Sequence, residues 1–329
     1  MYNKLEIRVF GPRRSGNHAI INWLAYQAKS KIYFFNCASN RGHDPYRTGK
    51  CRGDQYNEDL QSRFEQVPNL KHADDDTLAY YREVDKDILM YSYEDIDLDK
   101  YVRPRASDFP INRSSVIGDS SFCIDVIILR DVHNWLASKL KYNAVKKNYR
   151  EVSILAPRYE ENRNIRGKMP YFDTYPGYKE DAKLIEGRTY INLGKMINIW
   201  LSHTRAISFP EQYGMQNTVF INYNMWATNY HYRQSLMTSY FEPHGFEFTD
   251  KGKDEIAVRG GGSSFDGHNT GTNANEMDIL NRWKYFENNK LFNRIFEFYP
   301  SLDGINRNTF GRVRIDENEE DSNVITFMP

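Results

Sequence analysis

Side chains that bind anions follow two apolar, strand-like segments of this chain. Arg13 and Arg14 come directly after the first segment, and Arg130 comes directly after another. A guanidinium group holds a phosphate or sulfate through paired N–H donors. Ser138 lies eight residues after Arg130, and its hydroxyl can bind a further oxygen of the same anion. The residue types therefore predict two separate anion sites.

The first site has the spacing of a phosphate-binding turn. Gly11 and Gly16 frame four residues, which is the G-x-x-x-x-G pattern of the P-loop. A turn from strand to helix aims backbone N–H groups and the positive end of the helix dipole at one point. Asn17 and His18 replace the lysine and the Mg²⁺-binding hydroxyl, so we expect a phosphate cradle that does not use Mg²⁺-ATP in the ordinary way. A buried joint between strand and helix, with two surface arginines, is the alternative interpretation.

A late glycine-rich loop offers further backbone donors. It contains one arginine and three consecutive glycines, followed by two serines and an aromatic residue. We expect this loop to close over the phosphate held by Arg130, although a flexible hinge would have the same composition. Its candidate ligand-binding residues are Arg259, Gly260, Gly261, Ser263, Ser264 and Phe265.

The elements that position these residues are predicted from their apolar patterns. Short apolar segments alternate with helical patterns, which predicts a three-layer α/β/α fold with a central parallel sheet and a P-loop-like nucleotide-binding architecture. Ligands of such sheets bind at the carboxyl ends of the strands, where the arginines lie. The expected strands are 5–10, 31–36, 88–93, 126–129 and 218–223, and the expected helices are 16–28, 132–150, 193–207 and 277–298.

The domain organisation is predicted from shifts in composition. We expect one domain over residues 1–302, with insertions at about 37–86 and 156–188, and a polar tail at 303–329. The first insertion is long and polar and is expected to carry loops on the substrate side. The second is rich in Pro, Gly, Tyr and Arg without clear periodicity, which is typical of an insertion or a lid.

Composition excludes several classes of protein. The 44 basic and 44 acidic residues give a formal net charge of zero, so no overall field attracts nucleic acid or a membrane surface. No apolar run is long enough to span a bilayer, and Met1 leads almost directly into the first strand without a leader segment. Three cysteines without metal-ligand spacing favour a reducing compartment. We expect a cytoplasmic protein with no bound metal, and the sequence does not determine its oligomeric state.

In order and spacing, these motifs resemble those of the sulfotransferases that use 3′-phosphoadenosine 5′-phosphosulfate (PAPS). In that family a Pro-Lys-Ser-Gly-Thr-Thr loop binds the 5′-phosphosulfate, and the matching residues here are Arg13, Arg14, Ser15, Gly16, Asn17 and His18. Arg14 takes the place of the catalytic lysine. An arginine with a serine eight residues later binds the 3′-phosphate in the family, and Arg130 and Ser138 keep that spacing. Tyr223 matches a tyrosine near the adenine.

The late motifs of the family are matched in separate pieces. The family has an Arg-Lys-Gly element followed by Gly-x-Trp-Lys, and Arg259 with its glycines and Trp283-Lys284 each resemble one of these. Ser263-Ser264-Phe265 is similar to a Thr-Ser-Phe element near the adenine. The sequence leaves open whether the loop at Arg259 or the segment at Trp283 contacts the 3′-phosphate.

The resemblance implies transfer of a sulfuryl group from PAPS to a hydroxyl or amine of a glycan or small molecule. Such transfer is in-line and independent of metal, with Arg14 stabilising charge on the bridging oxygen. Family members carry a histidine or a glutamate as the base at the end of the third expected strand, which implies Glu94 here, with Tyr93 or a histidine as alternatives. Two other functions fit the same residues: a P-loop kinase that uses ATP, and a non-catalytic module that binds an anionic glycan.

Overall fold

The computed structural model describes residues 2–38, 44–51, 58–101, 116–147, 152–153, 191–256, 265 and 274–311. The chain divides into two compact units. The first comprises Met1–Leu129 and Lys195–Met277, and the second comprises Arg130–Gly194 and Asp278–Pro329. The two anion sites predicted from the sequence therefore belong to different units.

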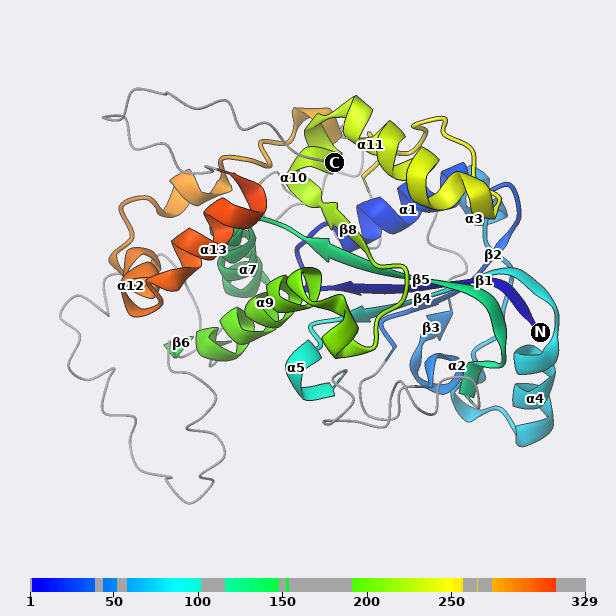
Figure 1. The fold of residues 1–329 in the computed structure, drawn as a ribbon. Helices are drawn as coiled ribbons and strands as arrows, with labels where there is room; N and C mark the ends of the chain where they lie inside the picture. Colours follow the sequence, from blue (N-terminus) through cyan, green and yellow to red (C-terminus); the bar gives the residue numbers. More distant parts are fainter. Residues whose placement is uncertain are drawn as a thin grey trace, which may run out of the picture. The chain divides into compact units, whose positions relative to one another are not determined.

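A six-stranded sheet forms the centre of the first unit (Figure 1). Its strand order is β3-β2-β4-β1-β5-β8, and all strands from β2 to β8 in this order are parallel. The strands are β1 Asn3–Gly11, β2 Ile32–Asn36, β3 Lys50–Cys51, β4 Lys86–Glu94, β5 Ser120–Leu129 and β8 Val219–Asn222. The expected α/β class and central parallel sheet are confirmed. The edge strand β3 pairs antiparallel with β2 and is not predicted by the sequence, because two residues are too few to show an alternating pattern.

Helices cover both faces of this sheet, and its central strands are therefore buried on both sides. On one face, Leu5, Ile7 and Val9 share a buried cluster with side chains of α1, α10 and α11. On the other face, Phe10 belongs to a second cluster with side chains of α4, α5 and α9. In Figure 1, α1, α10 and α11 lie above the sheet and α5 and α9 lie below it. Their bounds are α1 Asn17–Gln27, α4 Asp75–Glu83, α5 Leu98–Tyr101, α9 Leu193–Ser208, α10 Tyr223–Thr228 and α11 Tyr230–Leu236.

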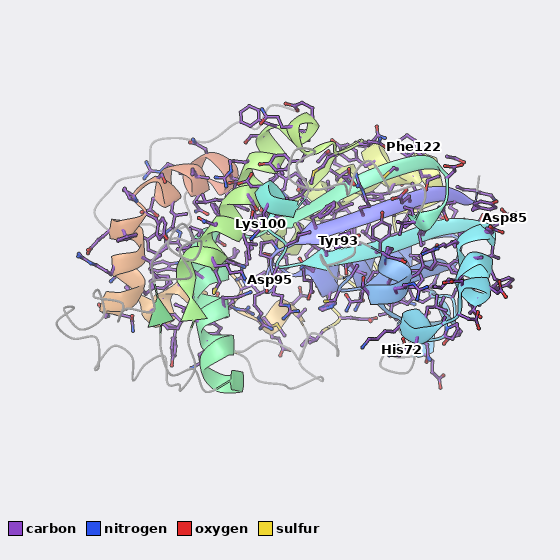
Figure 2. The ribbon with its side chains drawn as sticks, turned by 90° about the horizontal axis from the view of Figure 1, so that it is seen from below. His72, Asp85, Tyr93, Asp95, Lys100 and Phe122 are labelled. Carbon is purple, nitrogen blue, oxygen red and sulfur yellow. The ribbon has the colours of Figure 1, made fainter. Side chains whose placement is uncertain are left out.

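The order of the strands reverses at β1. From β1 the chain continues to β2 and β4 on one side, and then to β5 and β8 on the other. Ligands of open parallel sheets bind beyond the carboxyl ends of the strands at such a point. Gly11 at the end of β1 is in register with Glu94 at the end of β4, so both lie at this edge. Figure 2 shows Tyr93 and Asp95 toward this end of the strands, and Asp85 toward the opposite end.

Short helices and turns complete both units. In the first unit they are α2 Pro45–Thr48, α3 Glu58–Ser62, η1 Leu70–His72, η3 Pro210–Tyr213, η4 Met237–Phe241, η5 Glu242–His244 and η7 Ala274–Glu276. The second unit contains α7 Val132–Lys147, the parallel pair β6 Val152–Ser153 and β7 Ile191–Asn192, and then η8 Arg282–Phe286, α12 Lys290–Phe298 and α13 Ser301–Phe310. The domain end expected at 302 falls within α13, and the expected insertion 156–188 lies outside the described residues.

A network of charged and polar groups lies inside the sheet. Arg8 on β1 is 1% exposed, and its Nε and Nη2 donate to the two carboxylate oxygens of Asp125 at 2.5 and 2.6 Å. The same carboxylate accepts from the backbone N–H of Gln216 at 2.6 Å. Nearby, the Tyr91 hydroxyl donates to Glu6 at 2.5 Å. Because buried charges are tolerated when they are paired and hydrogen-bonded, these contacts allow charge within the core.

Candidate active site

The loop between β1 and α1 is closed by one of its own side chains. Nδ2 of Asn17 donates to the carbonyl oxygens of Gly11 at 3.0 Å and Pro12 at 3.4 Å. The backbone N–H of Ser15 donates to the Pro12 carbonyl at 3.2 Å. Gly11 has no room for a side chain, since a Cβ there would lie 2.3 Å from Oδ1 of Asn17. Asn17 therefore holds the shape of the loop at the position where the P-loop has a lysine.

Gly16 connects this loop to α1 and requires a glycine for two reasons. Its φ of 89° lies in the left-handed region. A Cβ at this position would lie 2.0 Å from a ring carbon of Tyr223. The Tyr223 ring, at the start of α10, also stacks on Trp226 with 5.8 Å between the ring centroids. The fold thus brings Tyr223, a residue predicted from the sequence, against the predicted anion loop.

Arg14 and Ser15 occupy the middle of the loop. Arg14 is half-buried and has a φ of 77°, which is uncommon for a residue other than glycine. Ser15 is fully buried, and its Oγ has no hydrogen-bond partner among the described residues. A buried hydroxyl without a partner is unfavourable, and an anion oxygen could accept its hydrogen. Both observations are typical of a loop that is shaped for a ligand.

Glu94 lies beside the loop and gathers donors from three segments. Its Oε2 accepts from Sγ of Cys37 at 2.7 Å and from Nε of Arg13 at 3.3 Å, and its Oε1 lies 3.6 Å from Nε2 of His18. Burial alone would raise the pKa of Glu94. The charge of His18, the hydrogen bond from Cys37 and the charge of Arg13 outweigh burial and lower that pKa. Glu94 is therefore an ionised carboxylate at neutral pH, with 8% of its side chain exposed.

Tyr93 is unsuited to the role of base, for which it is an alternative from the sequence. It is 1% exposed, and its ring stacks on Phe10 with 5.5 Å between centroids. Burial raises the pKa of its hydroxyl well above the ordinary value. Its neighbour Asp95 accepts a hydrogen bond from the backbone N–H of Arg13 at 2.8 Å. Of the residues at the end of β4, Glu94 and Asp95 are thus the ones that contact the loop.

Strained backbone gathers where three neighbouring strands end. Arg14, Cys37 and Asp95 follow β1, β2 and β4, and their φ angles are 77°, 54° and 56°. Residues other than glycine adopt this conformation at a cost of about 1–3 kcal/mol each, and such residues cluster at functional sites. The sequence gives little sign of this, because none of the three is a glycine.

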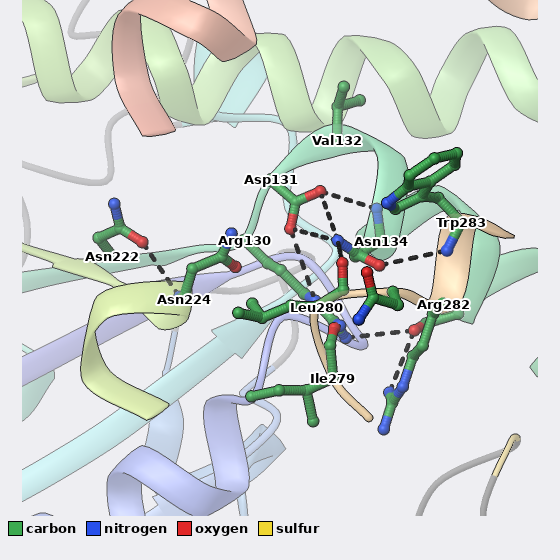
Figure 3. Close-up of polar contacts among 12 residues, drawn as sticks. Arg130, Asp131, Val132, Asn134, Asn222, Asn224, Ile279, Leu280, Arg282 and Trp283 are labelled. Carbon is green, nitrogen blue, oxygen red and sulfur yellow. Dashed lines mark hydrogen bonds and ion pairs between the residues drawn. The ribbon is translucent and has the colours of Figure 1, made fainter. Parts of the chain in front are cut away.

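In the second unit, two arginines converge on one serine. Nη1 of Arg130 and Nη1 of Arg282 each donate to Oγ of Ser138 at 3.2 Å. Arg130 also donates to the carbonyl of Ile279, and its Nε lies 3.9 Å from Asp131 (Figure 3). All three residues of the cluster are at least nine-tenths buried. Two guanidinium groups that share one acceptor repel each other, and a phosphate bound there would offset that repulsion.

The start of α7 positions this cluster. The carboxylate of Asp131 accepts from the backbone N–H of Asn134 at 2.8 Å and so caps the helix. The Asn134 side chain then donates to the carbonyl of Leu280 at 2.7 Å and accepts from the backbone N–H of Trp283 at 3.2 Å (Figure 3). Asn134 thereby fixes the segment that carries Arg282 next to Ser138, which is about two helical turns from Arg130.

Arg282 is a site residue that the sequence alone does not identify. The available signal is its position directly before Trp283-Lys284, one of the two segments proposed to contact the 3′-phosphate. The structure shows that Arg282 reaches Ser138, whereas Lys284 is exposed and lies over the Trp283 ring. Phe265 is a half-buried turn residue. The other residues of the late loop lie outside the described ranges: Arg259, Gly260, Gly261, Ser263 and Ser264.

Comparison of the chain with protein-family models, with curated proteins and with solved structures gave no significant match. The functional interpretation therefore depends on the residues and their geometry. In the described ranges, no three His, Cys, Asp or Glu side chains are grouped as ligands for a metal ion. None of the helices in the same ranges is both long enough and apolar enough to cross a bilayer.

Proposed function

We propose that this protein is a sulfotransferase that takes a sulfuryl group from PAPS and transfers it to a hydroxyl or amine acceptor. The observation that supports the proposal most is the convergence of Arg130 and Arg282 on Ser138, because two guanidiniums and a hydroxyl that meet at one point can donate together to the oxygens of a phosphate. The loop between β1 and α1 supplies a second candidate anion site at the switch point of the sheet. PAPS carries one anionic group for each of the two sites.

The residues present fit such a donor. At the loop, the buried Ser15 hydroxyl lacks a protein partner among the described residues, and the N-terminus of α1 adds backbone N–H groups. The Tyr223 ring against Gly16 offers an apolar surface for a nucleoside. We assign the 5′-phosphosulfate to this loop and the 3′-phosphate to the Arg130 cluster. A ligand that carries both groups tests whether the two sites bind one molecule.

Each candidate side chain has a chemical task in this mechanism. PAPS, when bound, supplies the sulfuryl group. Arg14 and the N–H groups at the start of α1 stabilise the negative charge that develops on the leaving oxygen, and one such donor is typically worth about 10²- to 10³-fold in rate. Glu94, an ionised carboxylate beside the loop, would receive the proton of the acceptor. A positioned base contributes about 10²- to 10⁴-fold.

The geometry of Asn17 argues against the kinase alternative. In a P-loop kinase a lysine at this position reaches the phosphates, whereas the Asn17 side chain donates back to the loop carbonyls of Gly11 and Pro12. A non-catalytic module that binds a sulfated or phosphorylated glycan would use the same two sites. Only a measurement of transfer separates that module from the enzyme.

Thermal unfolding with added nucleotides tests the donor. At a ligand concentration of one hundred times the dissociation constant, binding stabilises the folded state by about 2.7 kcal/mol. We expect this shift with 3′,5′-bisphosphoadenosine and not with ATP or GTP, with or without Mg²⁺. A shift with Mg²⁺-ATP alone would contradict the proposal.

Variants and labelled sulfate test the enzyme. Arg14→Ala should abolish transfer of labelled sulfate from PAPS to acceptors, and Arg130→Ala should raise the dissociation constant of the bisphosphate at least about tenfold, the equivalent of about 1.4 kcal/mol. Arg47→Ala is the matched control, because Arg47 is an exposed arginine paired with Asp75 on the surface. Binding of the bisphosphate without transfer to any glycan or small-molecule acceptor would favour the non-catalytic module.

A further inference from the structure

The second residue of α1 is a histidine that faces a buried carboxylate. His18 has 20% of its side chain exposed, and its Nε2 lies 3.6 Å from Oε1 of Glu94. The helix begins at Asn17, so the imidazole lies in the first turn, next to the N–H groups that we assign to an anion. Histidine is the side chain whose charge ordinarily changes between pH 5 and 8. A side chain that can gain or lose a positive charge therefore lies beside the loop.

Among Glu94, Asp95, Arg13 and His18, the net charge depends on whether His18 is protonated. Glu94 and Asp95 carry two negative charges, and Arg13 contacts both, with Nε 3.3 Å from Glu94 and 3.6 Å from Asp95. Arg13 supplies one positive charge, so the four groups sum to zero with His18 protonated and to one negative charge with His18 neutral. The Cys37 thiol donates its hydrogen to Glu94 and adds no charge while it is protonated.

Three further described residues lie near this pair or its loop: His203, Arg14 and Tyr223. His203 on α9 is the titrating group that interacts with Asp95 from the opposite face, and its burial lowers its pKa to about 4. It therefore stays neutral above about pH 5. Arg14 keeps its charge throughout. The Tyr223 ring reaches Gly16 from α10. Among the described residues beside the loop, His18 is of the type that ordinarily changes its charge between pH 5 and 8.

We propose that protonation of His18, held against Glu94, switches the loop between strong and weak binding of a sulfate or phosphoryl group. This inference rests on the proposed function of the loop as an anion site. Removing one positive charge beside a bound anion, in a partly buried setting, weakens binding by at least about tenfold. Binding of the sulfuryl donor is therefore strongest below neutral pH and weakens as the pH rises through the titration of His18.

Inorganic sulfate is the probe, because phosphate itself titrates near pH 6 and would obscure the effect. The protein is labelled with ¹⁵N-histidine, and the imidazole signal of His18 is identified by its loss in His18→Gln. We expect saturating sulfate to raise the pKa of His18 by about one unit, which is the reciprocal of a tenfold preference of sulfate for the protonated form. His72, an exposed residue on η1, is the internal control and should not respond.

Two variants separate the contributions of His18 and Glu94 to sulfate binding. His18→Gln should bind sulfate at the loop with the same affinity at pH 5.5 and 8.5. Glu94→Gln should lower the pKa of His18 and strengthen sulfate binding at pH 8.5 on the order of tenfold, because it removes one negative charge beside the loop. His72→Asn should behave like the unaltered protein in both measurements.

The outcomes separate this inference from the proposed function. If sulfate shifts the backbone amide signals of Ser15 and Gly16 but leaves the pKa of His18 unchanged, the proton switch is refuted and the anion loop stands. If neither sulfate nor 3′,5′-bisphosphoadenosine perturbs these amides at any pH from 5.5 to 8.5, the anion loop is refuted and the switch with it.

Discussion

Replacing Arg282 tests the cluster that carries the proposed function. The Arg282 side chain is 7% exposed and donates to Ser138, whose hydroxyl is shared with Arg130. A hydrogen bond to a charged group is worth about 1.5–3 kcal/mol, which corresponds to about 10- to 150-fold in affinity. Arg282→Ala also relieves the repulsion between the two guanidiniums in the free protein, so the lower half of that range applies. We expect a loss of about 10- to 40-fold for a ligand with a 3′-phosphate.

Calorimetric titration with two ligands isolates this effect from misfolding. The first ligand is 3′,5′-bisphosphoadenosine, and the second is adenosine 5′-phosphosulfate, which lacks the 3′-phosphate. Arg282→Ala should weaken the binding of 3′,5′-bisphosphoadenosine. It should leave the affinity for adenosine 5′-phosphosulfate within about twofold, since that ligand lacks the phosphate that Arg282 would contact. The affinity of Arg282→Lys for 3′,5′-bisphosphoadenosine should lie between that of Arg282→Ala and that of the unaltered protein, because an ammonium group cannot bind two oxygens in a fork.

A neighbouring lysine provides the matched control. Lys284 is two residues further along η8, is exposed, and lies over the Trp283 ring with its Nζ 5.9 Å from the ring centroid. Lys284→Ala should bind the bisphosphate like the unaltered protein. An equal loss for both ligands in Arg282→Ala, or a larger loss in Lys284→Ala, would refute the assignment of the 3′-phosphate to this cluster.

Three further predictions concern the framework of the first unit. Asp125→Ala removes the carboxylate from the buried guanidinium of Arg8 and should lower the free energy of unfolding by about 3–5 kcal/mol in urea denaturation, whereas a change below about 1 kcal/mol would show that the pair is dispensable. Gly16 and Gly245 both have a positive φ, but only a Cβ at Gly16 would meet another side chain, 2.0 Å from a ring carbon of Tyr223. Gly16→Ala should therefore be more destabilising than Gly245→Ala in thermal unfolding. Equal effects would contradict the close packing at Gly16. His203 has a pKa of about 4 when folded and about 6.5 when unfolded, so the unfolded state binds more protons between these values and stability falls as the pH drops through them. His203→Gln should remove that part of the acid destabilisation, and an unchanged pH profile of the unfolding free energy would exclude His203 as its source.

Local patterns were sufficient to predict the central strands and the turn between β1 and α1. The alternation of Leu5, Ile7 and Val9 marks a strand in the sequence, and these residues lie in the core on one face of the sheet. The glycine frame from Gly11 to Gly16 marks the turn because both positions need a residue without a side chain. Such features depend on neighbours in the chain, so composition and spacing carry them.

Tertiary structure decided which side chains meet. Arg282 and Ser138 are 144 positions apart in the sequence, and Cys37 and Glu94 are 57 apart. The contact of Tyr223 with Gly16 likewise depends on β8 joining the sheet beside β5. The spacing of apolar and polar residues in the sequence does not predict such contacts, because they arise from the packing of whole helices and strands.

The sequence by itself determined the arginines that follow the strands and the parallel sheet. Only the tertiary structure decided that Asn17 closes the loop, that Arg282 joins Arg130 at Ser138, and that His18 and Arg13 surround Glu94. The physical reason is that the charge state and partners of a side chain depend on its burial and on residues distant in the chain. A linear pattern shows which groups are present, and the fold sets the distances through which they interact.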